Sequence, residues 1–451
     1  MTRSRRVFRT ATGLLLAGVL VAPATNQALA AHPAPAPAAP AALVFPDMPA
    51  EVLDVYLRDY ADVPVDVLFH RISLSAARKH LLERFGSQHL ATFGGSWYDF
   101  RTGVWHLLAT TQAAADAMAR PARAAGIDVA TRIVRYTAEQ LRKRAAHIRA
   151  GADPMSRVSR DAGVDIMANR VKVAAPPAAR TRSDRMVNYT APGPKPGPDQ
   201  ACSNRRNCGA PLRTGLVIWR GDYDHPECSL GFTASATDGS KWAVTAGHCV
   251  HAINELWGHG GQYFGAVRQC GKPRTDPYAP CLPTDEVDVA RIKISNPYWL
   301  GTPMGYIFYN PTTAVDVDYA ILSRYTIETG DRVCMSSWHN NYTGFAAGDP
   351  YHRDEISYST CGTISDPFSV YYGMPMAHGV YPCGGDSGGA WLYYPGNGQR
   401  WAYGIHKNGS SADSDPGSIC GDGDQAWFSA VPAINDFFDA NSAAQVRIIT
   451  R

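Results

Sequence analysis

The chain has 451 residues, of which 45% are hydrophobic and 18% charged, which fits two or three globular domains and excludes a disordered protein. Its formal net charge of +3 is unevenly divided. Residues 201–451 hold 17 Lys and Arg against 24 Asp and Glu, whereas residues 1–200 hold 26 against 16. All ten cysteines lie in 201–451. The charge gives no argument for nucleic-acid binding, and the chain combines two chemically different parts.

Residues 1–30 are typical of a signal peptide. Four arginines stand among the first nine residues, an apolar run follows over 13–22, and Ala28-Leu29-Ala30 resembles a cleavage site. The run is too short to span a membrane, which takes about 20 residues. We therefore expect a secreted, extracellular protein with disulfide bonds and no membrane partner, exported by either the general or the twin-arginine route.

The next part of the chain predicts a spacer, a small α/β fold and a linker. Residues 31–50 are rich in proline and alanine, as in a flexible spacer. Residues 51–175, here termed the front region, contain no cysteine. In chain order we first expect a helical run over 81–85 that ends at Gly86, and then a hairpin of strands 91–100 and 104–110. An alanine-rich helix interrupted at Pro121 and a strand over 127–136 follow. A capping box at Thr137-Ala138-Glu139-Gln140 begins the next helix, and 164–173 is the last expected strand. Six prolines predict an exposed linker over 176–200.

Residues 201–451, here termed the β-rich region, differ from the front region in their pattern of residue types. Short aromatic and β-branched runs alternate with Gly, Pro, Asn and Asp, which is typical of an antiparallel barrel or sandwich. Asp238-Gly239, between 228–236 and 241–245, predicts a hairpin. Helical periodicity is confined to 431–438. The fold class expected here is therefore all-β.

Three short segments of the β-rich region carry residues suited to nucleophilic catalysis. They are TAGHC at 245–249, VDVA at 287–290 and GDSGG at 385–389. A serine hydroxyl becomes a nucleophile when a histidine accepts its proton and a buried carboxylate orients that histidine. Backbone N–H groups in a glycine-rich turn can hold the negative charge that develops in the reaction.

These segments, in this order, resemble the chymotrypsin-like serine proteases of the streptogrisin and alpha-lytic protease type. CSLGF at 228–232, the Asn-Pro-x-Trp sequel at 296–299 and the pair Val333-Cys334 with CGTI at 361–364 extend the resemblance over about 210–440. Gly95-Ser-Trp-Tyr-Asp99, Ala124-Ala-Gly126 and Asn169-Arg170-Val171 are similar to segments of the propeptides of those proteases. The resemblance implies two antiparallel six-stranded β-barrels after a small α/β prodomain.

The resemblance also implies residue roles. His248 would be the general base, Asp288 its orienting carboxylate and Ser387 the nucleophile, with the amides of Gly385 and Ser387 as the oxyanion hole. Asp386 would steady the oxyanion loop. It implies no metal or organic cofactor. Among ten cysteines the implied pairs are Cys228–Cys249, Cys334–Cys361 and Cys383–Cys420, with Cys202–Cys208 and Cys270–Cys281 as local closures.

Three alternatives concern the site. Gly385 to Gly389 also fits the G-x-S-x-G pattern of α/β hydrolases, but His406 is the only histidine after the serine and a strand pattern follows, so we reject that fold. Asp318 also resembles a catalytic strand aspartate. We favour Asp288 because it lies 40 residues after His248 and is followed by the Asn-Pro-x-Trp sequel. His248 and His251 lack a third ligand of suitable spacing for zinc.

The specificity pocket is expected around Tyr381, His406 and Gly409. Tyr381 stands where a trypsin-like enzyme has aspartate, which argues against a preference for Arg or Lys. His406 matches a pocket histidine of glutamate-specific relatives, so a preference for acidic residues is one hypothesis. A preference for bulky apolar residues, with His406 packed in the barrel wall, is the other.

The expected function is a secreted serine endopeptidase, monomeric when mature, that acts on proteins and peptides. The basic front region is expected to be a propeptide, an intramolecular partner that assists folding and blocks the site, because barrels of non-local strand pairs fold slowly. The opposite charges of the two parts favour their docking. The alternatives are a separate binding module in front, and an idle homologue that serves as a secreted binding protein.

Overall fold

The structure is a computed structural model of the whole chain, and it divides into two units, Met1–Val44 and Phe45–Arg451. The residues that it describes are 48, 53, 56, 57, 59–159, 162–174, 184–190, 211–220, 226–259, 262–271, 281, 283–284, 286–310, 313–337, 360–383, 385–410 and 424–451. The predicted signal peptide and nearly all of the spacer lie outside these residues, and so do Cys202, Cys208 and Cys420. No helix among the described residues is long and apolar enough to cross a membrane.

The front region is an α/β fold around a three-stranded sheet. β1 (Phe93–Asp99) pairs antiparallel with β2 (Val104–Ala109), which pairs in parallel with β3 (Asp128–Ile133). The helices are α2 (Val65–Ser73), α3 (Ser75–Gln88), α4 (Gln112–Ala124) and α5 (Ala138–Arg149), with a 3-10 turn at Pro154–Arg157. The predicted hairpin and the capping box of α5 are confirmed, since the Thr137 and Gln140 side chains each accept a hydrogen bond from the other's backbone amide.

Two local predictions in the helices are wrong. α3 begins at Ser75 and passes through Gly86 to Gln88, and the reason is tertiary. A Cβ at Gly86 would lie 2.5 Å from the Ser323 hydroxyl oxygen, so glycine here permits close packing rather than ending the helix. α4 runs through Pro121 to Ala124, although the proline has no N–H to donate to the Ala117 carbonyl; burial of Met118, Ala119 and Ala122 on one face favours the continued helix.

The predicted last strand of the front region is two strands. β4 (Ala162–Asp165) and β5 (Arg170–Ala174) form a hairpin whose turn includes Asn169 at a positive φ of 53°. β6 (Val187–Thr190) then pairs in parallel with β5. Because β6 lies inside 176–200 and Val187 is buried, this part of the proline-rich stretch is sheet rather than the expected linker.

The β-rich region begins with an eight-stranded antiparallel sheet. Its order is β24-β10-β11-β14-β13-β12-β8-β9. The strands are β8 (Val217–Arg220), β9 (Pro226–Ser229), β10 (Phe232–Ala236), β11 (Lys241–Thr245), β12 (Leu256–His259), β13 (Gln262–Cys270), β14 (Ala290–Ile294) and β24 (Val446–Ile448). The hairpin predicted at Asp238-Gly239 joins β10 to β11, although 228–236 is split between β9 and β10.

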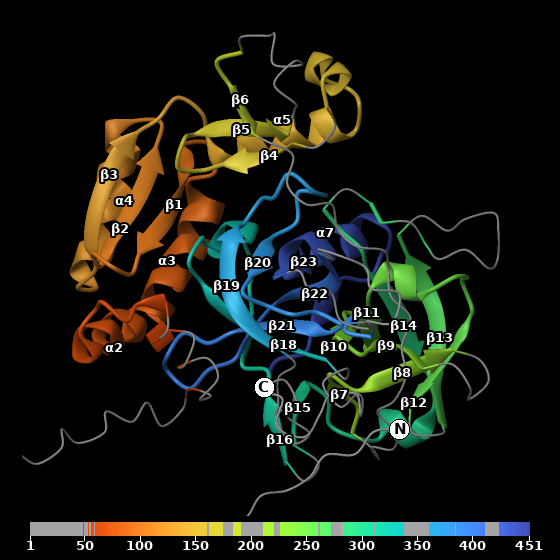
Figure 1. The fold of residues 1–451 in the computed structure, drawn as a ribbon. Coiled ribbons are helices and arrows are strands. Elements are labelled where there is room, and N and C mark those ends of the chain that lie inside the picture. The colour runs from red at the N-terminus through yellow and green to blue at the C-terminus, as the bar shows by residue number, and fades with distance from the viewer. Residues whose placement is uncertain are drawn as a thin grey trace, which may run out of the picture. The chain divides into compact units, whose positions relative to one another are not determined.

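The second sheet closes into a six-stranded barrel. Its order is β17-β22-β21-β18-β19-β20-β23, and β23 pairs again with β22, which closes the ring (Figure 1, teal to blue). The strands are β17 (Tyr319–Ala320), β18 (Arg332–Ser336), β19 (Thr360–Asp366), β20 (Met376–His378), β21 (Ala390–Tyr393), β22 (Trp401–Gly409) and β23 (Gln425–Ala430). The predicted two-barrel class is confirmed, with one correction: the first sheet has eight strands and stays open among the described residues.

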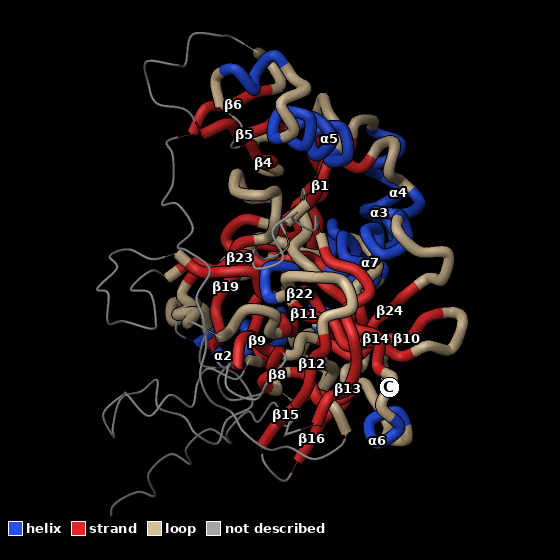
Figure 2. Tube along the Cα trace, turned by 90° about the vertical axis from the view of Figure 1, so that its right-hand side faces the viewer, coloured by secondary structure: helices blue, strands red, loops and turns tan. Residues whose placement is uncertain are grey.

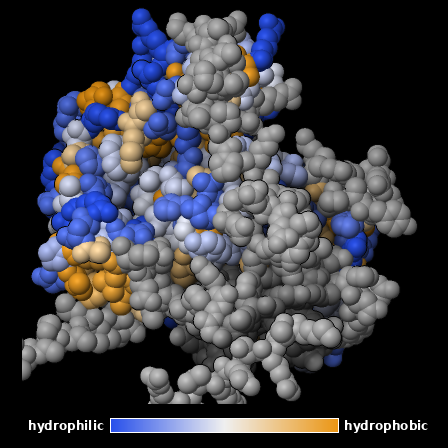
Figure 3. Space-filling view, viewed as in Figure 1, coloured by the Kyte–Doolittle hydropathy of each residue, from blue (hydrophilic) through white to orange (hydrophobic). Residues whose placement is uncertain are grey.

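The remaining elements complete the β-rich region. A small sheet is formed by β7 (Arg213–Thr214), β15 (Tyr306–Asn310) and β16 (Thr313–Asp316). α6 (Pro297–Leu300) and α7 (Val431–Ala440) are its described α-helices, and 3-10 turns lie at Gly247–Cys249 and Arg324–Thr326. Strand therefore dominates this region in Figure 2. Hydrophobic residues form small separate patches on the described part of the face in Figure 3.

The front region and the β-rich region share a buried cluster of charges. On α3, Arg78 and Lys79 are fully buried. The Lys79 ammonium lies 2.9 Å from Glu328 Oε2 and 2.7 Å from Asp331 Oδ1, and it donates to the Thr326 carbonyl at 2.8 Å. Arg78 Nε donates to Glu328 at 3.2 Å. Buried ions need such partners because leaving water costs each of them several kcal/mol.

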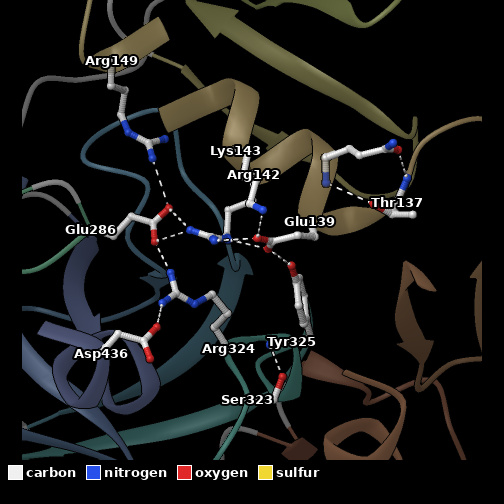
Figure 4. A network of polar contacts seen from close by, with 11 residues as sticks. Thr137, Glu139, Arg142, Lys143, Arg149, Glu286, Ser323, Arg324, Tyr325 and Asp436 are labelled. Carbon is white, nitrogen blue, oxygen red and sulfur yellow. Dashed lines mark hydrogen bonds and ion pairs between the residues drawn. The ribbon is translucent and has the colours of Figure 1, made fainter. Parts of the chain in front are cut away.

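A second ionic contact lies where α5 meets the β-rich region (Figure 4). The Glu286 carboxylate faces three arginines: Arg142 at 3.3 Å, Arg149 at 3.1 Å, and Arg324. Arg142 and Arg149 belong to α5, whereas Arg324 belongs to the β-rich region. Glu286 has a positive φ of 63°, a conformation that side chains other than glycine seldom adopt without support from their surroundings.

Candidate active site

Three side chains from distant parts of the sequence meet between the two sheets of the β-rich region. His248 lies in the 3-10 turn that follows β11, Asp288 lies two residues before β14, and Ser387 lies before β21. His248 Nδ1 is 2.6 Å from Asp288 Oδ2, and His248 Nε2 is 2.8 Å from Ser387 Oγ. All three residues are buried.

The surroundings of Asp288, His248 and Ser387 determine which atoms carry protons in their hydrogen bonds. A buried carboxylate accepts but does not donate, so Nδ1–H donates to Asp288 and Nε2 is left to accept from the Ser387 hydroxyl. Burial would raise the pKa of Asp288, but the charge and hydrogen bonds of His248 and the Lys407 ammonium hold it below its usual value. Ionised Asp288 therefore orients the imidazole in the tautomer that can take a proton from serine.

Local packing places the histidine against the aspartate. The His248 backbone N–H donates to Asp288 Oδ1 at 2.9 Å, so the carboxylate holds both the backbone and the ring. A Cβ at Gly247 would lie 2.6 Å from the same Oδ1, which explains the glycine of TAGHC. The Asp288 N–H in turn donates to the Ser429 hydroxyl at 2.8 Å.

The turn that carries Ser387 is tied to β9 through Ser229, the last residue of that strand. The Ser229 hydroxyl donates to the Gly385 carbonyl at 2.8 Å, and its N–H donates to the Ser387 carbonyl at 2.7 Å. Gly388 has a positive φ of 85°, and a Cβ there would collide with Thr245 and Ser229. In the described part of the chain the N–H groups of Gly385 and Ser387 donate to no acceptor.

Asp386 contacts groups that sequence reasoning could not name. Its carboxylate accepts from the Ser337 hydroxyl and from the Cys383 N–H, the latter at 2.7 Å. Ser337 follows β18, so the nucleophile turn is anchored to the closed barrel. Asp386 thus takes part in the internal hydrogen bonding of the turn that carries Ser387.

The alternative aspartate lies elsewhere. Asp318 accepts a hydrogen bond from the Arg400 N–H at 2.6 Å and pairs with the Arg400 guanidinium at 3.6 Å. Burial raises its pKa. It is the carboxylate of Asp288 that the structure brings to His248.

The expected pocket residues have different environments. Tyr381 is exposed, and Gly409 packs against Pro382. His406 is 1% exposed, and the Trp391 indole N–H points at its Nδ1 from 3.4 Å. Burial, followed by the charges of His248 and Lys407, lowers the pKa of His406 to about 3. A neutral, buried His406 favours the barrel-wall interpretation over a charged contact with an acidic substrate residue.

Disulfides brace the site. The structure joins Cys228 to Cys249, Cys270 to Cys281, and Cys334 to Cys361, which are three of the five implied pairs. The first links β9 to the residue after His248. Cys228, Cys249 and His248 form the one group among the described residues with ligand atoms close enough for a metal ion. Both sulfurs belong to the disulfide, so this group does not suit a metal.

No family model and no curated protein matches the chain. Similar solved structures include Nocardiopsis protease (20% identity, TM-score 0.34, covering 53% of this chain and 100% of that one), Cellulomonas bogoriensis chymotrypsin (21%, 0.34, 54% and 100%) and Thermobifida fusca protease A (21%, 0.34, 53% and 100%). A likeness at these identities and TM-scores carries no conclusion about the function of this chain.

Proposed function

We propose that residues 201–451 form a secreted serine endopeptidase that cleaves proteins and peptides through an acyl-enzyme. The observation that carries the proposal is the buried chain of hydrogen bonds from Asp288 through His248 to Ser387, with distances of 2.6 and 2.8 Å. Such a chain raises the nucleophilicity of a serine hydroxyl that is otherwise inert at neutral pH.

The reaction proceeds in two halves. Ser387 Oγ bonds to the carbonyl carbon of the substrate while its proton passes to His248 Nε2, which gives a tetrahedral oxyanion. The C–N bond then breaks, His248 returns the proton to the departing amine, and an ester remains on Ser387. In the second half water attacks the ester, His248 takes a proton from the water, and the acid product leaves as the proton returns to Ser387.

The amides of Gly385 and Ser387 are the donors proposed for the oxyanion. They belong to one tight turn that Ser229 and Asp386 hold rigid through the hydrogen bonds described above. Donors fixed before the substrate arrives stabilise developing charge without reorganisation, and one such donor typically contributes about 10²- to 10³-fold in kcat.

The test is covalent labelling with a fluorophosphonate, which reacts with an activated serine. We expect the purified chain to be labelled at Ser387 and to hydrolyse peptide substrates. The Ser387→Ala variant is the matched control and should lose both properties while keeping its circular-dichroism spectrum. Peptide binding without labelling would support the idle homologue instead and would contradict the proposal.

We further propose that the front region is a propeptide and the intramolecular partner of a protease that is monomeric when mature. Support comes from the depth of the contact: Lys79 and Glu328 are both fully buried where the two regions meet. The β4 strand also donates from the Val164 N–H to the Phe368 carbonyl at 3.0 Å. A surface of this kind can template a slowly folding barrel.

Expression of residues 201–451 without the front region tests that role. We expect little labelled protease, and recovery of labelling when residues 31–200 are supplied as a separate chain. The same fragment with Lys79→Met is the control, and it should rescue poorly. Full yield of active protease without any front region would contradict the folding role and favour a separate binding module.

A further inference from the structure

Lys407 lies beside the proposed catalytic aspartate. Its Nζ is 3.9 Å from Asp288 Oδ2, and its side chain is 4% exposed while that of Asp288 is fully buried. Lysine is almost never buried to this extent without a partner for its charge. The Lys407 carbonyl oxygen also lies 3.4 Å from Ser387 Oγ, so this one residue of β22 is close to both ends of the hydrogen-bonded chain.

A second group, the ring of Tyr372, lies close to the ammonium ion. The Tyr372 ring centroid is 4.6 Å from Lys407 Nζ, within the range of a cation–π interaction. Tyr372 has a positive φ of 59°, and its carbonyl accepts the Glu286 N–H at 3.0 Å. Strained backbone of this kind persists where the surroundings hold it firmly. An aromatic face and a carboxylate therefore form a built site for the lysine cation.

We infer that Lys407 is a positioning residue of the proposed reaction, whose ammonium ion shares the charge of Asp288 and so keeps His248 an unprotonated base at lower pH. This inference rests on the proposed function. Asp288 Oδ2 faces His248 Nδ1 on one side and Lys407 Nζ on the other. The aspartate favours a protonated imidazole, and the ammonium ion offsets part of that effect.

The other titratable groups around the pair do not alter the sign. His406, the neighbour of Lys407 on β22, is buried and neutral at physiological pH because burial lowers its pKa to about 3. Tyr372 faces Lys407 with its ring. Cys228 and Cys249, which lie against His248, are joined in a disulfide and do not titrate. Asp288 and Lys407 are therefore two charged groups whose opposing effects act on the protonation of His248.

The experiment is the pH dependence of the fluorophosphonate labelling rate, measured on the protein as an exporting host secretes it. Lys407→Met keeps an unbranched side chain one atom shorter and removes the charge. The acidic limb of its pH profile should move to higher pH by about one unit, since one charge a few ångströms away acts at this scale. Lys407→Arg keeps the charge and should bring the limb back toward the wild-type position.

The outcomes separate this inference from the function on which it rests. If Ser387 is still labelled in Lys407→Met but the acidic limb of the labelling-rate profile stays in place or moves to lower pH, the inference alone is overturned. A wild-type protein that is not labelled at any pH overturns the proposed function and this inference with it. If Lys407→Met does not fold, Lys407→Gln keeps a polar group at the site, and the same shift of the limb decides.

Discussion

Replacing Asp288 with asparagine is expected to lower kcat for peptide hydrolysis by about 10⁴-fold, because the amide leaves His248 in the wrong tautomer. Oδ1 accepts the His248 backbone N–H and Oδ2 accepts the ring Nδ1–H, so one of these two places must receive the asparagine NH₂. Placed at the ring, the NH₂ turns Nδ1 into an acceptor, and Nε2 then carries the proton that it should take from serine.

The matched control for this variant is Asp318→Asn. Asp318 is the other strand aspartate, and its contacts go to Arg400. Steady-state kinetics with one peptide substrate should show a wild-type kcat for Asp318→Asn. Circular dichroism should show that both variants are folded. A kcat for Asp288→Asn within tenfold of wild type, or a large loss in Asp318→Asn, would mean that the wrong carboxylate has been assigned.

Replacing Lys79 with methionine is expected to destabilise the full chain by about 3–5 kcal/mol. The substitution leaves Glu328 and Asp331 buried without the ammonium that lies 2.9 and 2.7 Å from them. Burial alone would raise the pKa of Glu328. The charges of Lys79 and Arg78 instead hold this pKa below its usual value, so the ionised carboxylate depends on its two cations. Arg78 alone cannot neutralise both acids.

Urea unfolding measures this effect, with Ser387→Ala as the background so that the chain does not cleave itself. Arg101→Met is the matched control, since Arg101 pairs with Asp62 at the surface, with the two side chains 54% and 61% exposed. Exposed pairs contribute little because water screens them. Equal midpoints for the Lys79 and Arg101 variants would contradict the importance that we give to the buried cluster.

Local signals in the sequence were sufficient for the hairpins and the cap. The turn at Asp238-Gly239 and the capping box at Thr137 depend only on neighbouring residues, so both can be predicted without knowledge of the fold. Gly86 shows the limit of such reasoning. Its neighbour is Ser323, more than 200 positions away in the sequence, and that contact favours glycine inside a helix.

The residues of the site also divide into those that local motifs could predict and those that depend on the fold. Motifs and their spacing were enough to bring forward His248, Asp288 and Ser387, because this chemistry requires those residue types. Lys407 was given no role from the sequence, since its contact with Asp288 depends on how β22 crosses the barrel. The pairing of Lys79 with Glu328 was not foreseen either, because nothing local in α3 indicates burial of its cations.

The position of Glu286 has a consequence for maturation of the chain. It stands two residues before Asp288, and two of its three arginine partners, Arg142 and Arg149, come from α5. A cut that let α5 depart would leave Arg324 as the remaining described countercharge of a carboxylate close to the proposed catalytic aspartate. If the front region is removed as proposed, the electrostatic surroundings of the proposed catalytic residues would change, so the precursor and the processed protein should differ in their response to ionic strength.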